Sequence, residues 1–348
     1  MKKFNFQYII IIFLILVLCN SFVVVGLNDN FEDKTFLQNN NDFYFVHITD
    51  THIRHKLYDI KENTKARLLT VLEHVIAFEK KPAFIVITGD LTEWGGSGIT
   101  GALNCIAFAN CFYEQDGQLY ADENLSIPVY TTPGNHDYCF NRNLKNYHRF
   151  IDKNHVDEKD RYVITYENIS LFFMDSGPNY YTNPITWFDI CGQGLYNSDI
   201  EWLDEALNNS NQKKIVLMHH PAINELNKWG RVGGVLIKNR QKFIDLCEKY
   251  DAEMVLAGHT HHAVIYDSNV NLYKDFPLNC SLYPPLYVQS DDCKQGIHYR
   301  NISIIGDDVW VEESVELEID MLEHNNIKTS YEYIFMNIER YILSLNNR

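Results

Sequence analysis

Five short apolar runs in the sequence each end in side chains that can bind a metal ion. Asp, Asn and His recur at these ends and Cys does not, which is the ligand set for Mn, Fe or Zn held through nitrogen and oxygen. Taken singly, each group is also compatible with an ordinary turn or polar loop. Their repetition at the same end of five runs favours a metal centre. The groups are Asp50-Thr51-His52, Gly89-Asp90, Gly134-Asn135-His136-Asp137, His219-His220 and Gly258-His259-Thr260-His261.

The apolar runs indicate buried strands, because they are short, rich in Val, Ile and Phe, and bounded by Gly and Pro. Helical periodicity separates them, at residues 64–79, 198–207 and 239–250. Strands that alternate with helices predict an α/β fold with parallel pairing. The carboxyl ends of such strands meet at one edge of a sheet, where ligands bind. The predicted strands are residues 43–48, 83–87, 128–131, 214–218 and 252–257.

Further elements complete the predicted layers. Residues 162–166 and 169–175 are separated by two residues and predict a hairpin. Short strands follow at 286–289, 297–305 and 309–315, and residues 331–345 predict a final helix packed back on the body. We find no internal repeat and no linker, so the sequence predicts a single domain.

Taken in order, the polar groups resemble the motifs of the calcineurin-like metallophosphoesterase superfamily. Asp-x-His, Gly-Asp, Gly-Asn-His-Asp, His and Gly-His-x-His are all present. The resemblance covers residues 43–265, the expected catalytic core, with 266–348 as C-terminal strands and a helix packed on the same domain. It implies a four-layer α/β/β/α sandwich of two mixed sheets, with a two-metal centre at one edge.

The resemblance also implies which residues hold two divalent ions (Mn, Fe or Zn). Asp90 would bridge the two ions. Of the adjacent histidines, His219 matches the family ligand because it stands two residues before Pro221. The first ion would be held by Asp50, His52, Asp90 and His261. The second would be held by Asp90, Asn135, His219 and His259.

The chemistry that the resemblance implies is hydrolysis of a phosphodiester by attack of a metal-bridging hydroxide. His136 would protonate the leaving oxygen or stabilise the transferring phosphoryl group, and Asp137 would either orient His136 or act as a structural cap. The Asp-x-His motif looks most like the phosphodiesterase branch. Purple acid phosphatases carry a Tyr where this chain has Glu93, so a purple iron centre is not expected. The alternatives are a phosphomonoesterase acting on nucleotides or phosphosugars, and an inactive scaffold that uses the fold for interactions.

Charge restricts the partners. The 348 residues include 46 acidic and 30 basic side chains, for a net charge of −16. An acidic surface repels a phosphate backbone, so no nucleic-acid polymer is expected as a partner. A small phosphoester substrate stays compatible, because bound metal ions reverse the local field. Substrate choice is expected to reside in the loops at residues 93–101, 177–194 and 224–238.

The N-terminus has the parts of a secretory signal peptide over residues 1–26. Lys2 and Lys3 precede an apolar run from Tyr8 to Cys19, and small residues lie near Gly26. Residues 27–42 form a polar lead-in. The sequence therefore predicts a secreted or luminal protein, with no stable membrane span once the signal is cleaved. An uncleaved membrane anchor is the alternative, because the apolar stretch is about long enough to span a bilayer.

An oxidising compartment favours disulfides among the seven cysteines that follow the signal. The spacing predicts the pairs Cys105–Cys111, Cys280–Cys293 and Cys139–Cys191, with Cys247 free and buried in a helix. Five glycosylation sequons are compatible with a secreted glycoprotein, at Asn124, Asn168, Asn208, Asn279 and Asn301.

Overall fold

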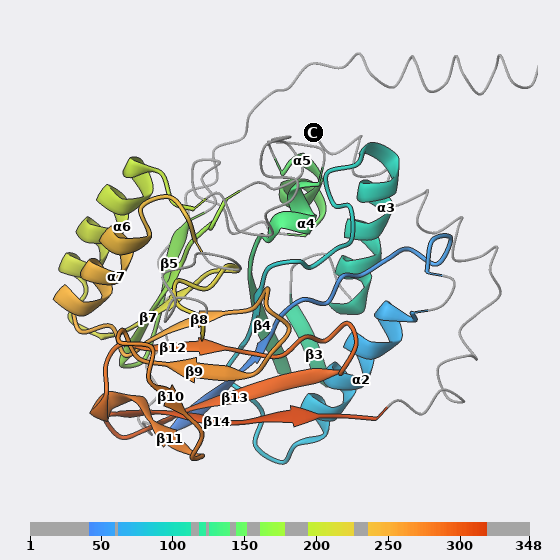
Figure 1. The fold of residues 1–348 in the computed structure, drawn as a ribbon. Coiled ribbons are helices and arrows are strands. Elements are labelled where there is room, and N and C mark those ends of the chain that lie inside the picture. Colours follow the sequence, from blue (N-terminus) through green and yellow to red (C-terminus); the bar gives the residue numbers. More distant parts are fainter. Residues whose placement is uncertain are drawn as a thin grey trace, which may run out of the picture. The chain divides into compact units, whose positions relative to one another are not determined.

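Two mixed sheets face each other, with helices on their outer faces (Figure 1). The predicted four-layer α/β/β/α sandwich is confirmed in this computed structural model. It describes residues 42–59, 62–112, 118–122, 125–139, 144–151, 161–177, 194–225 and 236–318. The predicted signal peptide, residues 27–41 of the lead-in and the helix at 331–345 lie outside these ranges. No helix within these ranges has the length and apolar character that crossing a membrane requires.

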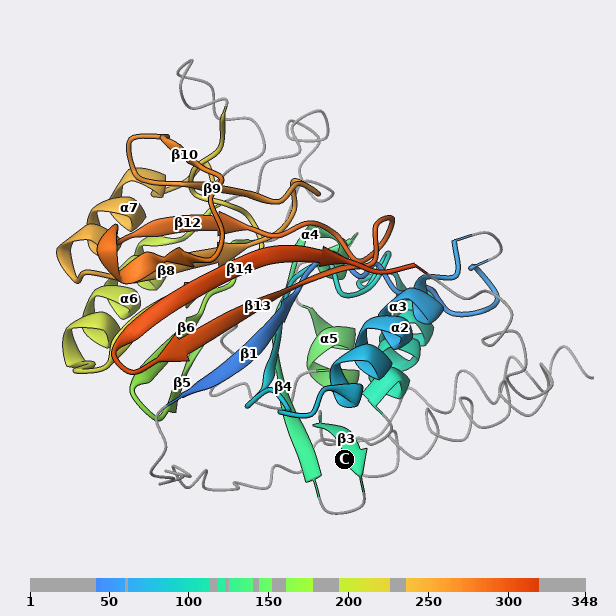
Figure 2. The same ribbon diagram turned by 90° about the horizontal axis from the view of Figure 1, so that it is seen from below.

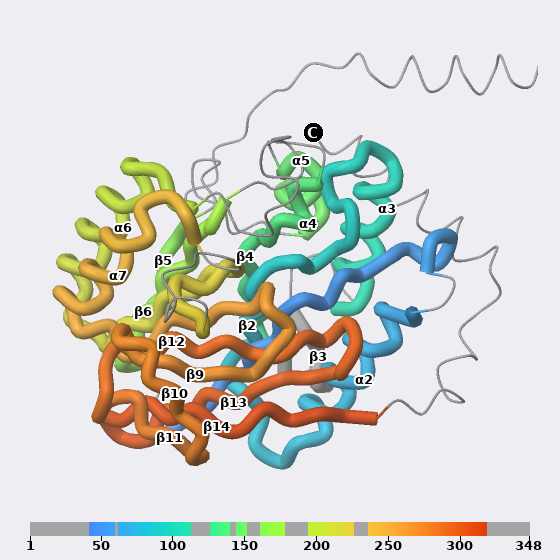
Figure 3. Tube along the Cα trace, in the orientation of Figure 1, coloured from blue at the N-terminus to red at the C-terminus, as the bar shows by residue number. Residues whose placement is uncertain are grey.

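The first sheet holds the strands that lead into three of the polar groups. β1 (Phe43–Ile48), β2 (Ile85–Thr88) and β4 (Leu125–Thr132) run parallel at its centre. β13 (His298–Ile305) pairs antiparallel with β1, so a strand from late in the chain lies beside the first one (Figure 3). The outer strands are β3 (Gln118–Asp122), β11 (Leu278–Asn279) and β14 (Asp308–Glu316), in the order β11-β14-β13-β1-β2-β4-β3.

The second sheet holds the strands that lead into the remaining two groups. β6 (Ile169–Phe173), β7 (Lys213–Leu217), β8 (Met254–Ala257) and β12 (Leu286–Gln289) run parallel. The predicted hairpin forms, because β5 (Tyr162–Tyr166) pairs antiparallel with β6. The sheet is completed by β9 (Val264–Tyr266) and β10 (Leu272–Tyr273), in the order β10-β9-β12-β8-β7-β6-β5.

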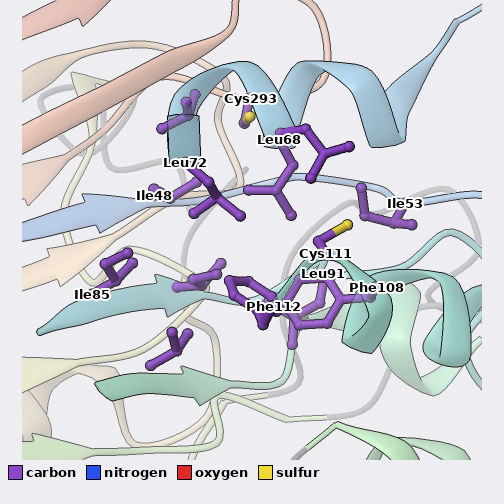
Figure 4. Packing of buried hydrophobic residues seen from close by; sticks show 14 of the residues in the cluster. Ile48, Ile53, Leu68, Leu72, Ile85, Leu91, Phe108, Cys111, Phe112 and Cys293 are labelled. Atoms are coloured by element: carbon purple, nitrogen blue, oxygen red, sulfur yellow. The ribbon is translucent and has the colours of Figure 1, made fainter. Parts of the chain in front are cut away.

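Alternation along β1 shows how the layers pack. Val46 and Ile48 point outward and join the core beneath α2 (Thr64–Ala77), where Leu68 meets them (Figure 4). Phe45 points the other way, into the gap between the sheets. A third core joins the second sheet to α6 (Asn197–Asn209) and α7 (Arg240–Lys249) on its outer face (Figure 2). Each sheet is therefore fixed on both faces, which holds its strand ends in place.

The predicted helices at 64–79, 198–207 and 239–250 are confirmed as α2, α6 and α7, but α3 (Gly98–Ala109) is new. The sequence predicts a loop over residues 93–101, because Gly and Thr are poor helix formers. The helix begins within that segment. Its buried Ile106 and Phe108 decide the outcome, since tertiary packing of an apolar face stabilises a helix more than propensity does.

The disulfide predictions for Cys105–Cys111 and Cys280–Cys293 are wrong, and Cys139 is also free. Cys280 lies in the core between the sheets, whereas Cys293 lies in the core beneath α2, on the other side of the first sheet. The Cys111 thiol instead donates to the Ala107 carbonyl oxygen, 3.4 Å away. Cys247 is free and fully buried, as predicted. Cys191 lies outside the described residues.

Candidate metal centre

The residues predicted as metal ligands all follow the carboxyl ends of strands, and both sheets contribute. The first sheet supplies two carboxylates, one amide and one imidazole, and the second supplies three imidazoles. Parallel strands from two facing sheets can therefore deliver both ligand types to one edge of the sandwich. Asp50 and His52 follow β1, Asp90 follows β2, Asn135 opens α4 (Asn135–Tyr138) after β4, His219 follows β7, and His259 and His261 follow β8.

One oxygen of each buried aspartate faces the imidazoles. Asp90 Oδ2 lies 3.5 Å from His52 Nε2 and 3.3 Å from His219 Nε2. Since these two histidines are assigned to different ions, Asp90 occupies the place that a bridging ligand needs. Asp50 Oδ1 lies 3.3 Å from His261 Nε2 and 3.8 Å from His52 Nε2. The ligands predicted for the first ion are thus gathered around the two carboxylates.

The other oxygen of each aspartate is fixed by hydrogen bonds. Asp50 Oδ2 accepts from the Thr49 hydroxyl and from the His259 N–H, both at 2.8 Å. Asp90 Oδ1 accepts from the His136 N–H at 2.7 Å. These bonds tie the strand ends of both sheets to the carboxylates. They also place Asn135, the residue before His136, beside the site.

Several atoms turned into the site have no hydrogen-bond partner although they are buried. A buried polar atom without a partner costs free energy, so such atoms are rare unless something else satisfies them. The ligand atoms of Asp50, Asp90 and His219, and those of Asp50, His52 and His261, lie within 4.8 Å of one another, so cations bound there would satisfy them, and N and O donors suit Mn, Fe or Zn. The residues present therefore fit divalent ions. The atoms are Asp50 Oδ1, His52 Nε2, Asn135 Oδ1 and His219 Nε2.

The backbone is strained at most of the ligand positions. A non-glycine residue at positive φ is uncommon, and the cost is roughly 1–3 kcal/mol for each residue. Such strain persists where the surrounding structure enforces it, commonly at functional sites. The five ligand residues concerned are Asp50, His52, Asp90, His259 and His261, with φ of 53°, 45°, 49°, 68° and 53°.

The glycines of the motifs allow close approach to the ligands. A Cβ on Gly258 would lie 1.9 Å from Thr49 Oγ1 and 2.4 Å from Asp50 Oδ2. A Cβ on Gly89 would lie 2.5 Å from the His219 ring, and its φ of +75° also favours glycine. The glycine in each motif is therefore required by the packing of the residue that it faces.

Acceptors behind the site hold the imidazole rings by their second nitrogen. His52 Nδ1 lies 3.0 Å from Glu93 Oε2, and His219 Nδ1 lies 3.0 Å from the Thr88 carbonyl oxygen. His261 Nδ1 lies 3.5 Å from Asp292 Oδ2. In each case the contact leaves Nε2 directed into the site. This is the usual way in which proteins orient a metal-binding histidine.

The His136 side chain is 17% exposed, whereas the neighbouring His52 side chain is 2% exposed. His136 Nδ1 lies 2.7 Å from Glu93 Oε1, and its Nε2 lies 3.9 Å from Asp90 Oδ2. Asp137 does something else: its two oxygens accept from the N–H groups of Leu91, Thr92 and Gly134 at 2.9–3.1 Å. This geometry favours the structural cap for Asp137, and Glu93 is the carboxylate that meets the His136 ring.

Glu93 and Asp292 are the residues that sequence reasoning misses. Glu93 accepts from His52 and also contacts Arg54 and Lys294, each 3.3 Å away. The position of Glu93, three residues after Asp90, could have indicated a role at the site. Asp292 is far from the motifs in sequence, so nothing comparable indicates it. Residues 178–193 and 226–235 of the predicted substrate loops lie outside the described residues.

Without metal, the buried histidines and aspartates of the site shift one another's pKa values. Burial alone lowers the pKa of His52, but Asp50, Glu93 and Asp90 raise it to a net value of about 10. Burial likewise lowers the pKa of His219, and Asp90 and Asp50 raise it to about 9. Burial alone raises the pKa of both aspartates, but the facing histidines hold it below its usual range. The metal-free site is thus an array of carboxylates and protonated imidazoles near neutral pH.

We expect metal binding near neutral pH to release protons. His52 and His219 have pKa values above neutral in the metal-free protein, and a histidine must be neutral to bind a metal. Metal affinity should therefore rise with pH until these values are passed, and fall as pH decreases. Titration calorimetry with Mn or Zn in two buffers of different ionisation enthalpy measures the protons released. Equal apparent enthalpies in both buffers would contradict the prediction.

Comparisons with known proteins are consistent with this geometry. A probable glycerophosphodiester phosphodiesterase, GpdQ, from Arcobacter nitrofigilis is 28% identical over 227 residues, which cover 62% of this chain and 71% of that protein. A probable cyclic nucleotide phosphodiesterase from Rhodococcus erythropolis is 24% identical over 225 residues, which cover 63% and 65%. Purple acid phosphatase 3 from Arabidopsis thaliana is 26% identical over 201 residues, which cover 54% and 51%.

Solved structures show the same fold. The purple acid phosphatase PPD1 from yellow lupin has a TM-score of 0.54 at 12% identity, covering 82% of this chain and 52% of that one. This chain thus spans about half the length of the two purple acid phosphatases that it matches. A family model described as calcineurin-like phosphoesterase matches residues 43–263. Because this match spans more than half of the sequence and contains every polar group described above, the chain belongs to the calcineurin-like phosphoesterase family.

Proposed function

We propose that the protein is a two-metal phosphodiesterase. The observation that carries the proposal is the clustering of Asp50, Asp90 and His side chains, whose ligand atoms lie within 4.8 Å of one another in overlapping groups of three. Asp50, His52, Asp90 and His261 would hold one divalent ion, and Asp90, Asn135, His219 and His259 the other. Such ions supply Lewis acidity toward phosphoryl oxygens and lower the pKa of a water molecule.

In this proposal His136 gives its proton to the leaving oxygen. Its side chain is partly exposed, so a substrate can approach the ring. Glu93 Oε1 lies 2.7 Å from Nδ1, which orients the ring and leaves Nε2 for the leaving oxygen. The Glu93 carboxylate is itself kept ionised, because His136 and His52 lower its pKa against the opposing effect of burial. The pair therefore provides a positioned general acid.

The proposed preference for a diester rests on similarity to other proteins. Two of the curated relatives are named as probable phosphodiesterases, and the Asp50-x-His52 motif resembles that branch. A monoesterase acting on nucleotides or phosphosugars is the second candidate, and the match to a plant purple acid phosphatase supports it. An interaction scaffold is less well supported, because all seven ligand positions and His136 are filled.

We also propose that the chain enters the secretory pathway and is released from its signal near Gly26. The basic start and apolar run of residues 1–26 support this. The mass of the protein purified after expression in a secretory host tests the proposal. A chain that starts at or near Leu27 supports cleavage, whereas a chain that retains residues 1–26 in the membrane fraction contradicts it. The Asn208 sequon is exposed, so we expect a glycan there sooner than at the buried Asn279.

We expect His136→Ala to lower the rate of diester hydrolysis by about 10²–10⁴-fold, the usual contribution of a general acid. The assay uses an aryl phosphodiester and an aryl phosphomonoester, with added Mn or Zn. The wild-type protein should cleave the diester faster. Both ions should stay bound in the variant, because His136 is not a ligand, and elemental analysis checks this.

The substrate comparison and the metal analysis in that experiment test different parts of the proposal. Faster monoester cleavage by the wild-type protein would move the assignment to a phosphatase. Loss of metal from the His136→Ala variant would show that this residue binds an ion. A wild-type protein that holds no metal and cleaves neither ester would support the scaffold.

Glu93→Gln should lower kcat by about 10–100-fold while KM and the thermal midpoint change little. The amide keeps the size of the side chain but removes the carboxylate that lies 2.7 Å from His136 Nδ1. Glu93→Asp, which retains the charge, should recover part of the loss. Asp137→Asn is the matched comparison: it weakens the bonds to backbone N–H groups, so it should lower the thermal midpoint more than Glu93→Gln does. The reverse order of midpoints would return the orienting role to Asp137.

A further inference from the structure

A buried chain of polar side chains crosses the gap between the two sheets next to the metal centre. The fully buried His47 lies in its middle. His47 Nε2 lies 2.7 Å from Thr88 Oγ1, and His47 Nδ1 lies 2.8 Å from Ser290 Oγ. The Arg300 Nε–H donates to Ser290 Oγ at 3.3 Å. The proposed reaction uses none of these four side chains directly.

Strand alternation turns all four side chains inward. Phe45, Val86, Val288 and Ile302 belong to the core between the sheets, and each lies two positions before or after a member of the chain. The polar residues therefore share the inner faces of β1, β2, β12 and β13 or their immediate ends. Hydrophobic side chains at such positions would stabilise the sandwich without the cost of burying polar groups.

Thr88 and Ser290 lie next to the groups that orient two of the predicted metal-binding histidines. The Thr88 carbonyl oxygen accepts from His219 Nδ1 at 3.0 Å. Ser290, on the other side, precedes the turn that contains Asp292, whose carboxylate lies 3.5 Å from His261 Nδ1. His47 thus connects the strand end that orients His219 in one half of the site with the strand end that orients His261 in the other half.

Arg300 is compatible with one direction of hydrogen bonding along this chain of side chains. A guanidinium only donates, so Ser290 Oγ accepts from Arg300 and is free to donate its own proton to His47 Nδ1. His47 then donates from Nε2 to Thr88 Oγ1. The ring has a single proton for this purpose, because burial and then Arg300 lower the pKa of His47 to about 3. Arg300 is held in place by the Glu312 carbonyl oxygen, 2.6 Å from Nη1.

We infer that His47 is a positioning residue for the metal centre, which sets the spacing between the two halves of the ligand set by joining Thr88 to Ser290. The inference rests on the proposed metal-binding function. Without His47, two buried hydroxyl groups lose their shared partner, and the side-chain link from Thr88 to Ser290 is lost. The ligands would then remain present but lie in a less suitable geometry, which lowers metal affinity.

The test compares His47→Leu with Phe45→Leu, a substitution on the same strand and the same inner face two residues earlier. Metal affinity is measured by calorimetry with Zn or Mn, and the thermal midpoint of the metal-free protein reports stability. His47→Leu should weaken metal binding by about 10–100-fold, the range found for residues that support ligands. Phe45→Leu should lower the thermal midpoint and leave affinity unchanged. His47→Gln, which keeps a donor and an acceptor, should recover part of the affinity.

Thr88→Val provides a second variant if His47→Leu does not fold, because it removes only the hydroxyl and keeps the carbonyl that holds His219. It should weaken metal binding in the same direction. Wild-type affinity in a folded His47→Leu or Thr88→Val protein would overturn the inference and leave His47 a purely structural residue. A wild-type protein that binds neither metal would instead overturn the proposed function.

Discussion

Two aspartates, Asp50 and Asp90, are buried side by side, and the surrounding structure offsets the cost of placing their charges there. Such a pair is costly unless cations and donors compensate it. Backbone and hydroxyl donors satisfy one oxygen of each, and imidazoles face the other. The histidines supply positive charge while the site is empty of metal. The same geometry then favours divalent ions, because they bring more charge to the same point.

The sandwich is what makes this arrangement possible. The aspartates come from the first sheet, and His219, His259 and His261 come from the second, so neither sheet alone can form the site. The acceptors behind the rings come from more distant parts of the chain: Glu93 follows the second strand, and Asp292 follows a strand that is added late. Packing of the helices on the outer faces then keeps the two sets of strand ends from shifting.

Much of this could be predicted from sequence, because the ligands are local to strand ends. The run before Asp50 and the pattern of apolar residues give both a strand and the point where it stops. Glu93 and Asp292 could not be predicted in the same way, since their roles depend on distances across the fold. The disulfide predictions were wrong for a related reason: Cys280 and Cys293 are close in sequence but lie on opposite sides of a sheet. Helix α3 could not be predicted from sequence because its first residues favour a loop, and its buried face is evident only in the structure.

The left-handed backbone at five ligand positions has a consequence for evolution. Each such residue stores strain that glycine would relieve. A lineage with no need for the metals would gain stability by replacing these residues, so drift would remove them early and in one direction. In a lineage that uses the proposed metal ions, selection would oppose that drift at every one of these positions. A descendant that used the fold only for contacts would therefore be recognised first by relaxed, glycine-containing turns where Asp50, His52, Asp90, His259 and His261 now stand.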